Sequence, residues 1–354
     1  MMNLIHGGDW AGYELEYGKT PLDFSANISP LGIPLSVRSA VIRELGTADR
    51  YPDPLCRNLR YSLSVFHSIP AEQIVCGNGA SDLIDRLCRS MQPKRAAVFV
   101  PGFAEYERAL QAQGCEMKTI SLPEKKDYQL TETELRQIPE GCELLFLCNP
   151  NNPTGLLTGP EILEQLLSLC RETGMRLVVD ECFLDFTREP ERFSMIKKLP
   201  KHPELVILRA FTKLWGMAGL RLGYALCGSE TVAEQLCNCG QPWPVSGLAQ
   251  AAGVAALEEK DYVQAVRELV RKERPRMQKE LLKMGFRVIR GEANFLLFDS
   301  GDPALGKKLR ERGILLRDCG NFQALCPGWY RTAIRTAEEN DILLRTLWEV
   351  RDCG

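Results

Sequence analysis

The chain has 354 residues, of which 45% are hydrophobic and 25% are charged, and its formal net charge at pH 7 is −2. This length suffices for two domains, each with a core of its own. A near-neutral charge argues against a protein that coats nucleic acid or an anionic membrane. No apolar run reaches the roughly 20 residues that span a bilayer, and the N-terminus lacks the basic start of a secretion signal. We therefore expect a cytoplasmic protein without a nucleic-acid or membrane partner.

The 14 cysteines and three histidines bear on metal and disulfide chemistry. The nearest cysteine pair, Cys237 and Cys239, has C-x-C spacing, which is not the C-x-x-C repeat of a zinc site. Most other cysteines are scattered through apolar runs, as expected for reduced thiols in a core. So few histidines argue against a histidine metal site or a Ser-His-Asp triad. We expect no bound metal.

The chain divides into three parts by its pattern. Residues 1–35 are rich in Gly, Pro, Ser and Asn and predict an irregular N-terminal arm. Across residues 36–236, short β-type runs alternate with helical patterns, which predicts an α/β domain whose mostly parallel, seven-stranded sheet is covered by helices. The predicted strands are Gln73–Cys76, Ala96–Val100, Glu116–Ile120, Leu144–Cys148, Arg176–Val179, Glu204–Leu208 and Leu222–Cys227. Residues 237–354 predict a smaller α+β C-terminal domain.

The helical patterns follow the same division. Ser36 is a candidate cap for a helix that ends at Gly46. Four more helices are predicted between the strands of the large domain, at Ser81–Met91, Ala104–Ala112, Pro160–Arg171 and Glu230–Leu236. In the smaller domain we predict helices at Leu248–Glu258, Tyr262–Met284, Ala304–Arg312 and Glu338–Val350, and strands at Arg287–Ile289, Phe295–Phe298 and Ile314–Arg317.

Ligands of parallel sheets bind outside the carboxyl ends of the strands, and two unusual segments lie there. The run 77–82 (GNGASD) follows a strand and opens a helix, which is typical of an anion site. A plain glycine turn capped by Ser81 is the structural alternative. It is not a dinucleotide fingerprint, because Asp82 occupies the third glycine position. Phe103 follows the next strand and either stacks on a flat ring or belongs to the core.

Three further strand ends carry sharper signals. The run 149–155 (NPNNPTG) fixes its backbone with two Asn-Pro steps and directs the amide of Asn152 into a cleft. Asp180 ends a buried strand, so its carboxylate needs a cationic partner, either a protonated pyridine nitrogen or a structural ion pair. Lys213 follows an apolar run, and Arg221 lies eight residues later. A buried lysine amine suits condensation with an aldehyde.

These elements together resemble the fold-type-I pyridoxal-phosphate enzymes of the aspartate aminotransferase superfamily (class I/II). The resemblance covers essentially the whole chain, and Asp180 follows Asn152 by 28 residues and precedes Lys213 by 33. It implies pyridoxal 5′-phosphate (PLP) as cofactor, with Lys213 as the Schiff-base lysine and Asp180 as the partner of the pyridine nitrogen. It implies the remaining cofactor contacts for Gly79, Ala80, Ser81, Phe103, Asn152, Thr212 and Arg221. Tyr51, in the run RYPDP, is similar to the tyrosine that reaches the neighbouring subunit's phosphate, which implies a homodimer.

Within the superfamily, the sequence is most similar to those of threonine-phosphate decarboxylases and histidinol-phosphate aminotransferases. The segments 23–32 (DFSANISPLG), 103–110 (FAEYERAL) and 316–322 (LRDCGNF) resemble the decarboxylases. This resemblance implies decarboxylation of L-threonine O-3-phosphate to (R)-1-amino-2-propanol O-2-phosphate in cobalamin biosynthesis. The alternative is a histidinol-phosphate-type or other class I/II aminotransferase. A ligand-sensing domain of a transcription regulator would need an attached DNA-binding module, and the chain begins directly with the arm.

The resemblance also implies substrate contacts, and the sequence differs from the family pattern at two positions. Arg331 matches the usual carboxylate-binding arginine, and Arg317 and Arg335 are further cations that either hold a phosphate or lie on the surface. A small phosphorylated amino acid would suit such a pocket, with Asn152 in the cleft and His6 and Asn27 closing it. Phe183 replaces a tyrosine found in many aminotransferases. Ala210 stands where a Ser or Thr usually contacts the phosphate, which removes one hydrogen bond to the cofactor.

Overall fold

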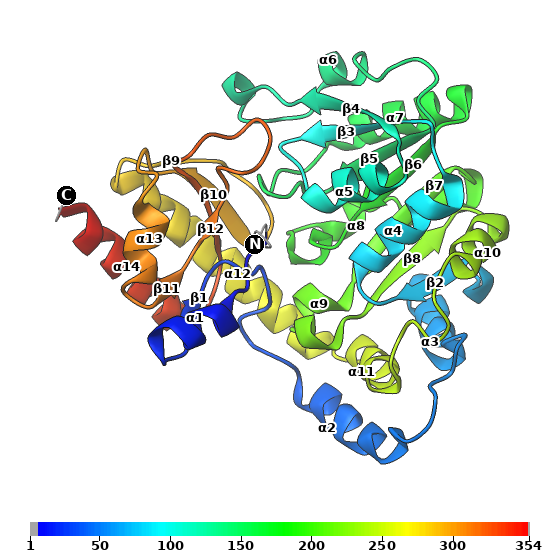
Figure 1. Ribbon diagram of the computed structural model, residues 1–354, viewed down its shortest axis with the longest axis horizontal. Helices are drawn as coiled ribbons and strands as arrows, with labels where there is room; N and C mark the ends of the chain where they lie inside the picture. The colour runs from blue at the N-terminus through cyan, green and yellow to red at the C-terminus, as the bar shows by residue number, and fades with distance from the viewer. Residues whose placement is uncertain (1–5, 353–354) are drawn as a thin grey trace.

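The computed structural model describes residues 6–352 and shows two lobes joined by a long helix (Figure 1). The large lobe contains a sheet in the order β2-β8-β7-β6-β5-β3-β4. Its strands are β2 (Ile74–Gly77), β3 (Arg95–Val100), β4 (Glu116–Ser121), β5 (Leu144–Cys148), β6 (Arg176–Asp180), β7 (Leu205–Ala210) and β8 (Gly223–Cys227). Only β8 runs antiparallel to its neighbours β2 and β7 within this sheet of the described chain. The expected seven-stranded, mostly parallel sheet is confirmed.

The strands of this sheet are apolar because helices cover both of its faces. The helices of the large lobe are α2 (Leu35–Glu44), α3 (Arg57–His67), α4 (Ala80–Met91), α5 (Ala104–Ala112), α6 (Glu132–Leu135), α7 (Pro160–Thr173), α8 (Pro190–Phe193), α9 (Phe211–Leu214), α10 (Glu230–Asn238) and α11 (Gly247–Leu257). One buried cluster joins side chains of α4, α5 and α10 to one face, and another joins α3, α7 and α11 to the other. Residues such as Val178 and Val179, adjacent on β6, therefore point into different clusters.

The small lobe is built on a second sheet, in the order β12-β13-β10-β9. Its elements are α12 (Lys260–Lys283), β9 (Arg287–Val288), β10 (Phe295–Asp299), α13 (Leu305–Arg310), β11 (Ile314–Leu315), β12 (Arg317–Asp318), β13 (Trp329–Ala333) and α14 (Ala337–Asp352). Helix α12 buries Met277 and Leu281 in the core of this lobe, and its earlier residue Val266 packs in the core of the large lobe. The domain boundaries expected near residues 35 and 236 stay predictions.

The N-terminal arm is more ordered than its composition indicates. It contains α1 (Trp10–Tyr17) and β1 (Leu22–Asp23), and β1 pairs in parallel with β11 of the small lobe. Asp9 caps α1 by accepting a hydrogen bond from the Gly12 N–H. The prediction of an irregular arm was wrong at α1 and β1, because a short helix with a side-chain cap and a two-residue strand leave almost no periodic signal.

Two predicted caps also differ from the structure. Helix α2 begins after Pro34, and the Ser36 hydroxyl donates to Glu259 instead of capping the helix. Helix α4 has Gly79 at its N-cap, so Ser81 lies inside the first turn and does not cap it. Helix α3 and strand β13 were not anticipated. No helix in the described part of the chain is long and apolar enough to cross a membrane.

Candidate active site

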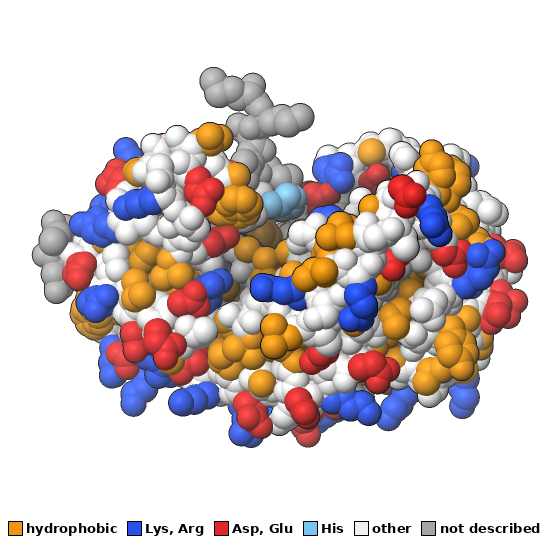
Figure 2. All heavy atoms as spheres, turned by 90° about the horizontal axis from the view of Figure 1, so that it is seen from below, with side chains coloured by type: hydrophobic (Ala, Val, Ile, Leu, Met, Phe, Trp, Pro, Cys, Tyr) orange, Lys and Arg blue, Asp and Glu red, His pale blue; other side chains and the backbone are white. Residues whose placement is uncertain are grey.

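A cavity of about 510 Å³ lies at the carboxyl ends of the large sheet's strands, where residues from both lobes and the arm meet. The surface is hollowed between the two lobes in Figure 2. Nine of the residues predicted to bind cofactor or substrate line this cavity: His6, Asn27, Ser81, Phe103, Asn152, Lys213, Arg221, Arg317 and Arg331. They come from segments more than 300 residues apart, so the cavity is a product of the tertiary fold.

Lys213 lies on α9, the single turn that follows β7. Its Nζ is 5.4 Å from the centre of the Phe183 ring. Burial lowers the pKa of Lys213, and the charges of Arg331 and Arg221 lower it further, while Cys182 and Asp180 oppose the shift. A lowered pKa makes the neutral amine more accessible near neutral pH, which is the form that attacks an aldehyde.

Asp180 is buried at the end of β6, on the strand next to the one that leads to Lys213. Its Oδ2 accepts a hydrogen bond from the Tyr106 hydroxyl at 2.7 Å, and its Oδ1 accepts one from the Cys182 N–H at 3.0 Å. The Tyr106 ring is stacked on Phe146, which fixes the donor. No cationic partner contacts this carboxylate within the described residues, so a protonated ring nitrogen fits the need for a positive charge.

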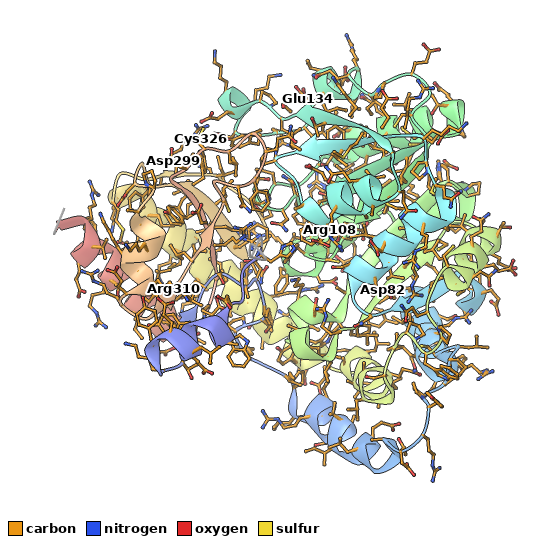
Figure 3. All side chains as sticks on the ribbon, viewed as in Figure 1. Asp82, Arg108, Glu134, Asp299, Arg310 and Cys326 are labelled. Carbon is orange, nitrogen blue, oxygen red and sulfur yellow. The ribbon has the colours of Figure 1, made fainter. Side chains whose placement is uncertain are left out.

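The start of α4 forms a cradle for an anion. Gly79 is the N-cap with φ +81°, no side chain caps the helix, and the first N–H groups are therefore available. A Cβ on Gly79 would lie 2.7 Å from an Arg221 Nη, so glycine lets that guanidinium approach the helix end. Arg221 itself has φ +56°. Asp82, whose position near the start of α4 is labelled in Figure 3, accepts from the Asn78 N–H at 2.8 Å and shapes the turn.

Two arginines from neighbouring strands meet on the opposite wall. Arg317 on β12 is the register partner of Arg331 on β13, and both are buried. Arg331 donates to Asn152 Oδ1 and, at 3.2 Å, to the Ser25 carbonyl. Burial together with the charge of Arg317 lowers the pKa of Arg331 to about 10. Like charges directly across a sheet are destabilising, so this wall suits an anionic ligand.

The arm contributes the mouth of the cavity. The His6 ring nitrogen Nε2 lies 2.8 Å from Glu105 Oε1, and the His6 ring centre is 5.8 Å from that of Phe103. Both polar atoms of the buried Asn27 amide lack a hydrogen-bond partner among the residues described. A buried, unsatisfied amide costs about 1–3 kcal/mol, and a bound ligand would remove that cost.

Six of the residues predicted to bind cofactor or substrate are not among those that line the cavity: Asp180, Gly79, Ala80, Thr212, Tyr51 and Arg335. Arg335 is ion-paired with Glu339 at 2.6 Å and donates to the Asp23 carbonyl. Tyr51 is 80% exposed and its ring is stacked on Trp243. Thr212 is buried beside Lys213, and Gly79 and Ala80 form the cradle just behind Ser81.

The sequence reasoning missed the cavity residues Ser25, Glu105 and Arg108. Arg108 lies on the side of the large lobe that faces the small one (Figure 3). Glu105 and Arg108 belong to the segment 103–110 (FAEYERAL), but an acid in the first turn of a helix ordinarily only favours that helix end. No local pattern shows that these residues meet the N-terminal arm.

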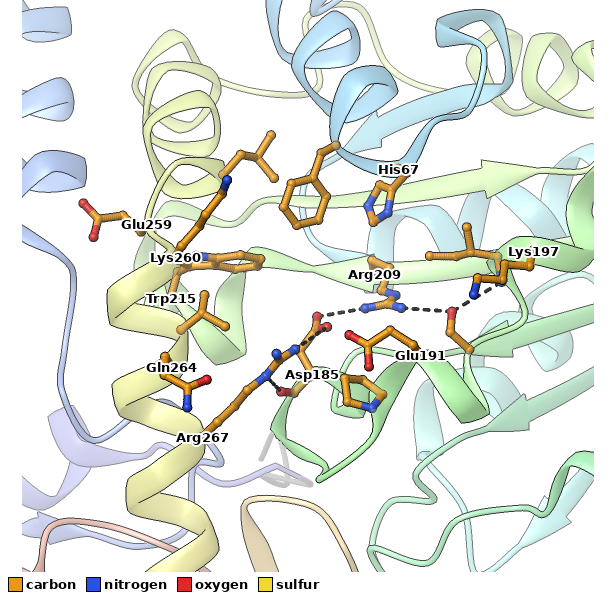
Figure 4. A pocket seen from close by; sticks show the side chains of 16 residues that line it. His67, Asp185, Glu191, Lys197, Arg209, Trp215, Glu259, Lys260, Gln264 and Arg267 are labelled. Carbon is orange, nitrogen blue, oxygen red and sulfur yellow. Dashed lines mark hydrogen bonds and ion pairs between the residues drawn. The ribbon is translucent and has the colours of Figure 1, made fainter.

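A second cavity, of about 480 Å³, lies elsewhere, against α12 (Figure 4). Its buried charge, Arg209, donates to Glu181 at 2.7 Å and to Asp185 at 2.8 Å. His67 in this cavity is hydrogen-bonded to the Tyr224 hydroxyl. The Arg209 Nε has no hydrogen-bond partner among the described residues, and none of the residues predicted to bind cofactor or substrate lines this cavity.

The fold and the first cavity define a PLP-dependent enzyme of fold type I. The family model of the aminotransferases of class I and II matches residues 19–347, and the chain belongs to that family. It is similar to the threonine-phosphate decarboxylase of Salmonella typhimurium, with 37% identity over 99% of this chain and 97% of the relative. It is also similar to the solved histidinol-phosphate aminotransferase of Clostridium acetobutylicum, with 30% identity, a TM-score of 0.87, and coverage of 94% and 99% of the two chains.

A further solved structure shares the fold. The histidinol-phosphate aminotransferase of Sinorhizobium meliloti was solved in complex with pyridoxal 5′-phosphate and matches with a TM-score of 0.88 at 22% identity, covering 99% of this chain and 96% of the other. The cofactor of this family is PLP, and the residues at this site fit it: the start of α4 offers donors for a phosphate, the Asp180 carboxylate has no cationic contact among the described residues, and Lys213 lines the cavity.

Proposed function

We propose that the protein is a PLP-dependent lyase that decarboxylates L-threonine O-3-phosphate to (R)-1-amino-2-propanol O-2-phosphate, a step of cobalamin biosynthesis. The observation that carries the proposal is the buried pair Arg317 and Arg331, which faces Lys213 across one cavity. Two adjacent guanidinium groups suit a substrate with two anionic groups, a carboxylate and a phosphate. The 37% identity to a threonine-phosphate decarboxylase supports the same reading.

The residues around the cofactor would have three roles: holding its phosphate, contacting its ring, and carrying it covalently. Gly79, Ala80, Ser81, Thr212 and Arg221 would hold the phosphate of PLP at the α4 cradle. Phe103 would stack on the ring, Asn152 would donate to the ring oxygen, and Asp180 would pair with the ring nitrogen. Lys213 would carry the cofactor and later move a proton at the substrate's Cα. When bound, PLP supplies an electron sink for the bond that breaks at Cα.

The choice of bond depends on how the chain holds the substrate. The bond at Cα that stands perpendicular to the cofactor ring is the one that breaks. Arg317, Arg331, Asn27 and His6 would hold the phosphate and the carboxylate so that the Cα–carboxylate bond takes that orientation. Carbon dioxide leaves, and one proton is added to Cα in its place.

A second candidate function is transamination of histidinol phosphate, an amino-alcohol phosphate without a carboxylate, or of an amino acid. The 30% identical solved aminotransferase favours it. The same lysine, aspartate and anion cradle would serve, because the reactions differ in which bond at Cα breaks. In that case the bond from Cα to the carboxylate of an amino acid, or to the phosphate-bearing carbon of histidinol phosphate, would lie near the ring plane and leave Cα–H perpendicular to it.

We test the proposal by giving the purified holoenzyme carboxyl-labelled L-threonine O-3-phosphate. Release of labelled carbon dioxide with an equal amount of the amine phosphate supports decarboxylation. Histidinol phosphate with 2-oxoglutarate is supplied in parallel, and formation of glutamate without carbon dioxide supports the aminotransferase. Lys213→Ala is the control for both, because a full rate without this lysine would contradict either function.

We also propose a homodimer in which Tyr51 reaches the cofactor phosphate of the neighbouring subunit. Tyr51 is exposed, and so are Leu35, Ile42 and Leu55 on the segment around it. Exposed apolar side chains gathered on one segment are typical of a surface that another chain covers. The proposed environment of this dimer is the cytoplasm.

A further inference from the structure

Glu105 places a negative charge in a cavity that we propose binds a doubly anionic substrate. Among the described residues it is the one acidic side chain that lines the cavity, beside Lys213, Arg221, Arg317 and Arg331. It is 7% exposed. A carboxylate in this position repels a phosphate, so its presence requires a function that offsets that repulsion.

The contacts of Glu105 show what it does in the fold. Its Oε1 lies 2.8 Å from His6 Nε2, on the arm, and its Oε2 accepts from Arg108, one turn later on α5. It lies in the first turn of α5, where the helix dipole favours a negative charge. The hydrogen bond from His6 and the ion pair with Arg108 hold the pKa of Glu105 below its ordinary value, against the effect of burial. The carboxylate is therefore ionised at neutral pH and bonded at both oxygens.

The arm on the other side of this contact is held by backbone packing. The Gly8 N–H donates to Ser25 Oγ at 2.8 Å. A Cβ on Gly7 would lie 2.3 Å from the Ser25 carbonyl oxygen, so the chain can follow this course only with glycine there. Ser25 in turn follows β1, which pairs with β11 of the small lobe. The arm thus rests on the small lobe's side and reaches the large lobe through His6.

We propose that Glu105 is a positioning residue that anchors His6 across the mouth of the cavity, and that it sets the affinity for a phosphorylated substrate through that histidine. The part of the proposal that concerns the substrate rests on the function proposed above. The anchoring itself does not depend on which reaction is catalysed. The ring of His6 is held 5.8 Å from Phe103, the first residue of the same segment, so one turn of α5 places both the stacking ring and the histidine.

The test compares Glu105→Gln with Glu107→Gln in the holoenzyme. Glu107 lies on the same turn, does not line the cavity and is a matched loss of one carboxylate. We expect Glu105→Gln to raise KM for L-threonine O-3-phosphate about tenfold and to change kcat less than twofold, with both constants of Glu107→Gln near wild type. His6→Ala should raise KM by a similar factor, and the double variant should not exceed the larger single effect by more than twofold. Additive effects in this cycle would overturn the proposal.

Hydrogen exchange of the arm provides a readout that does not need the reaction. Peptides covering residues 6–12 should exchange at least tenfold faster in Glu105→Gln than in wild type or Glu107→Gln. Gly7→Ala displaces the same segment without changing a charge and should show the same exchange and the same rise in KM. If neither the wild type nor any variant releases carbon dioxide while hydrogen exchange of the arm differs as expected, the proposed function is wrong and the anchoring of His6 by Glu105 is supported. Unchanged exchange in Glu105→Gln contradicts the anchor whatever the substrate.

Discussion

Arg331 is the residue for which activity and stability should respond in opposite directions. It is buried beside Arg317, its register partner, and its pKa is lowered from the ordinary 12.5 to about 10, mainly by burial. At 1.36 kcal/mol per pKa unit this corresponds to a penalty of about 3 kcal/mol for the charged form in the folded protein. The penalty is fully present at every pH below the folded pKa and disappears only above the ordinary one, so it applies in full at pH 7.

Replacing Arg331 with Gln removes this penalty and also removes hydrogen bonds. The guanidinium donates to Asn152 Oδ1 and to the Ser25 carbonyl, contacts that together contribute about 1–3 kcal/mol. We therefore expect the free energy of unfolding to stay unchanged or to rise by up to about 2 kcal/mol. Binding of an anionic substrate group should lose about 3 kcal/mol, which raises KM about 100-fold.

The assay measures KM for L-threonine O-3-phosphate and the thermal midpoint of the same holoenzyme preparations. Arg345→Gln, an exposed arginine on α14, is the control for loss of one positive charge. The expected pattern for Arg331→Gln is a large rise in KM with an equal or higher midpoint. A midpoint lowered by several degrees with an unchanged KM would refute the reasoning, because Arg331 would then stabilise the fold and not the substrate.

Three further predictions follow from other parts of the molecule. Ala210→Ser restores a hydroxyl three residues before Lys213, at a buried position, and should tighten PLP binding about fivefold, as one hydrogen bond of about 1 kcal/mol does; a weaker affinity in cofactor titrations would contradict this. Burial lowers the pKa of His67 from 6.5 to about 3. The free energy of unfolding should therefore fall by about 1.4 kcal/mol per pH unit as the pH falls from 6.5 toward 3, because the unfolded chain binds a proton that the folded chain does not. In urea unfolding, His67→Gln should lose stability less steeply over this pH range. Sedimentation should give about twice the 39.8 kDa chain mass. Mixing Tyr51→Phe subunits with Lys213→Ala subunits should yield mixed dimers in which one of the two sites has both Tyr51 and Lys213 intact. A monomer in sedimentation would exclude the proposed role of Tyr51.

The large sheet could be predicted because its strands are buried on both faces. A strand such as β5 is a continuous apolar run, and its neighbours along the chain are helices with an apolar stripe. The positions of Asn152, Asp180 and Lys213 after their strands then follow from the rule that ligands bind at the carboxyl ends. Strand β13, with the sequence WYRTA, carries a buried arginine and threonine and gives no such run.

The small lobe and the arm could not be predicted to the same depth. The pairing of Arg317 with Arg331 depends on the register of two short antiparallel strands, and two residues of β12 give no measure of register. The contact between His6 and Glu105 joins segments 99 residues apart. Such contacts depend on how the lobes and the arm pack together, and local propensity carries no information about that packing.

The central claim, decarboxylation at a site built for a doubly anionic amino acid, is tested most directly by comparing two values of kcat/KM on one preparation. One is for carbon dioxide release from L-threonine O-3-phosphate, and the other is for glutamate formation from histidinol phosphate and 2-oxoglutarate. We predict that the first exceeds the second by at least 100-fold and that Arg317→Gln and Arg331→Gln each reduce it. A larger value for glutamate formation would contradict the claim and establish the aminotransferase.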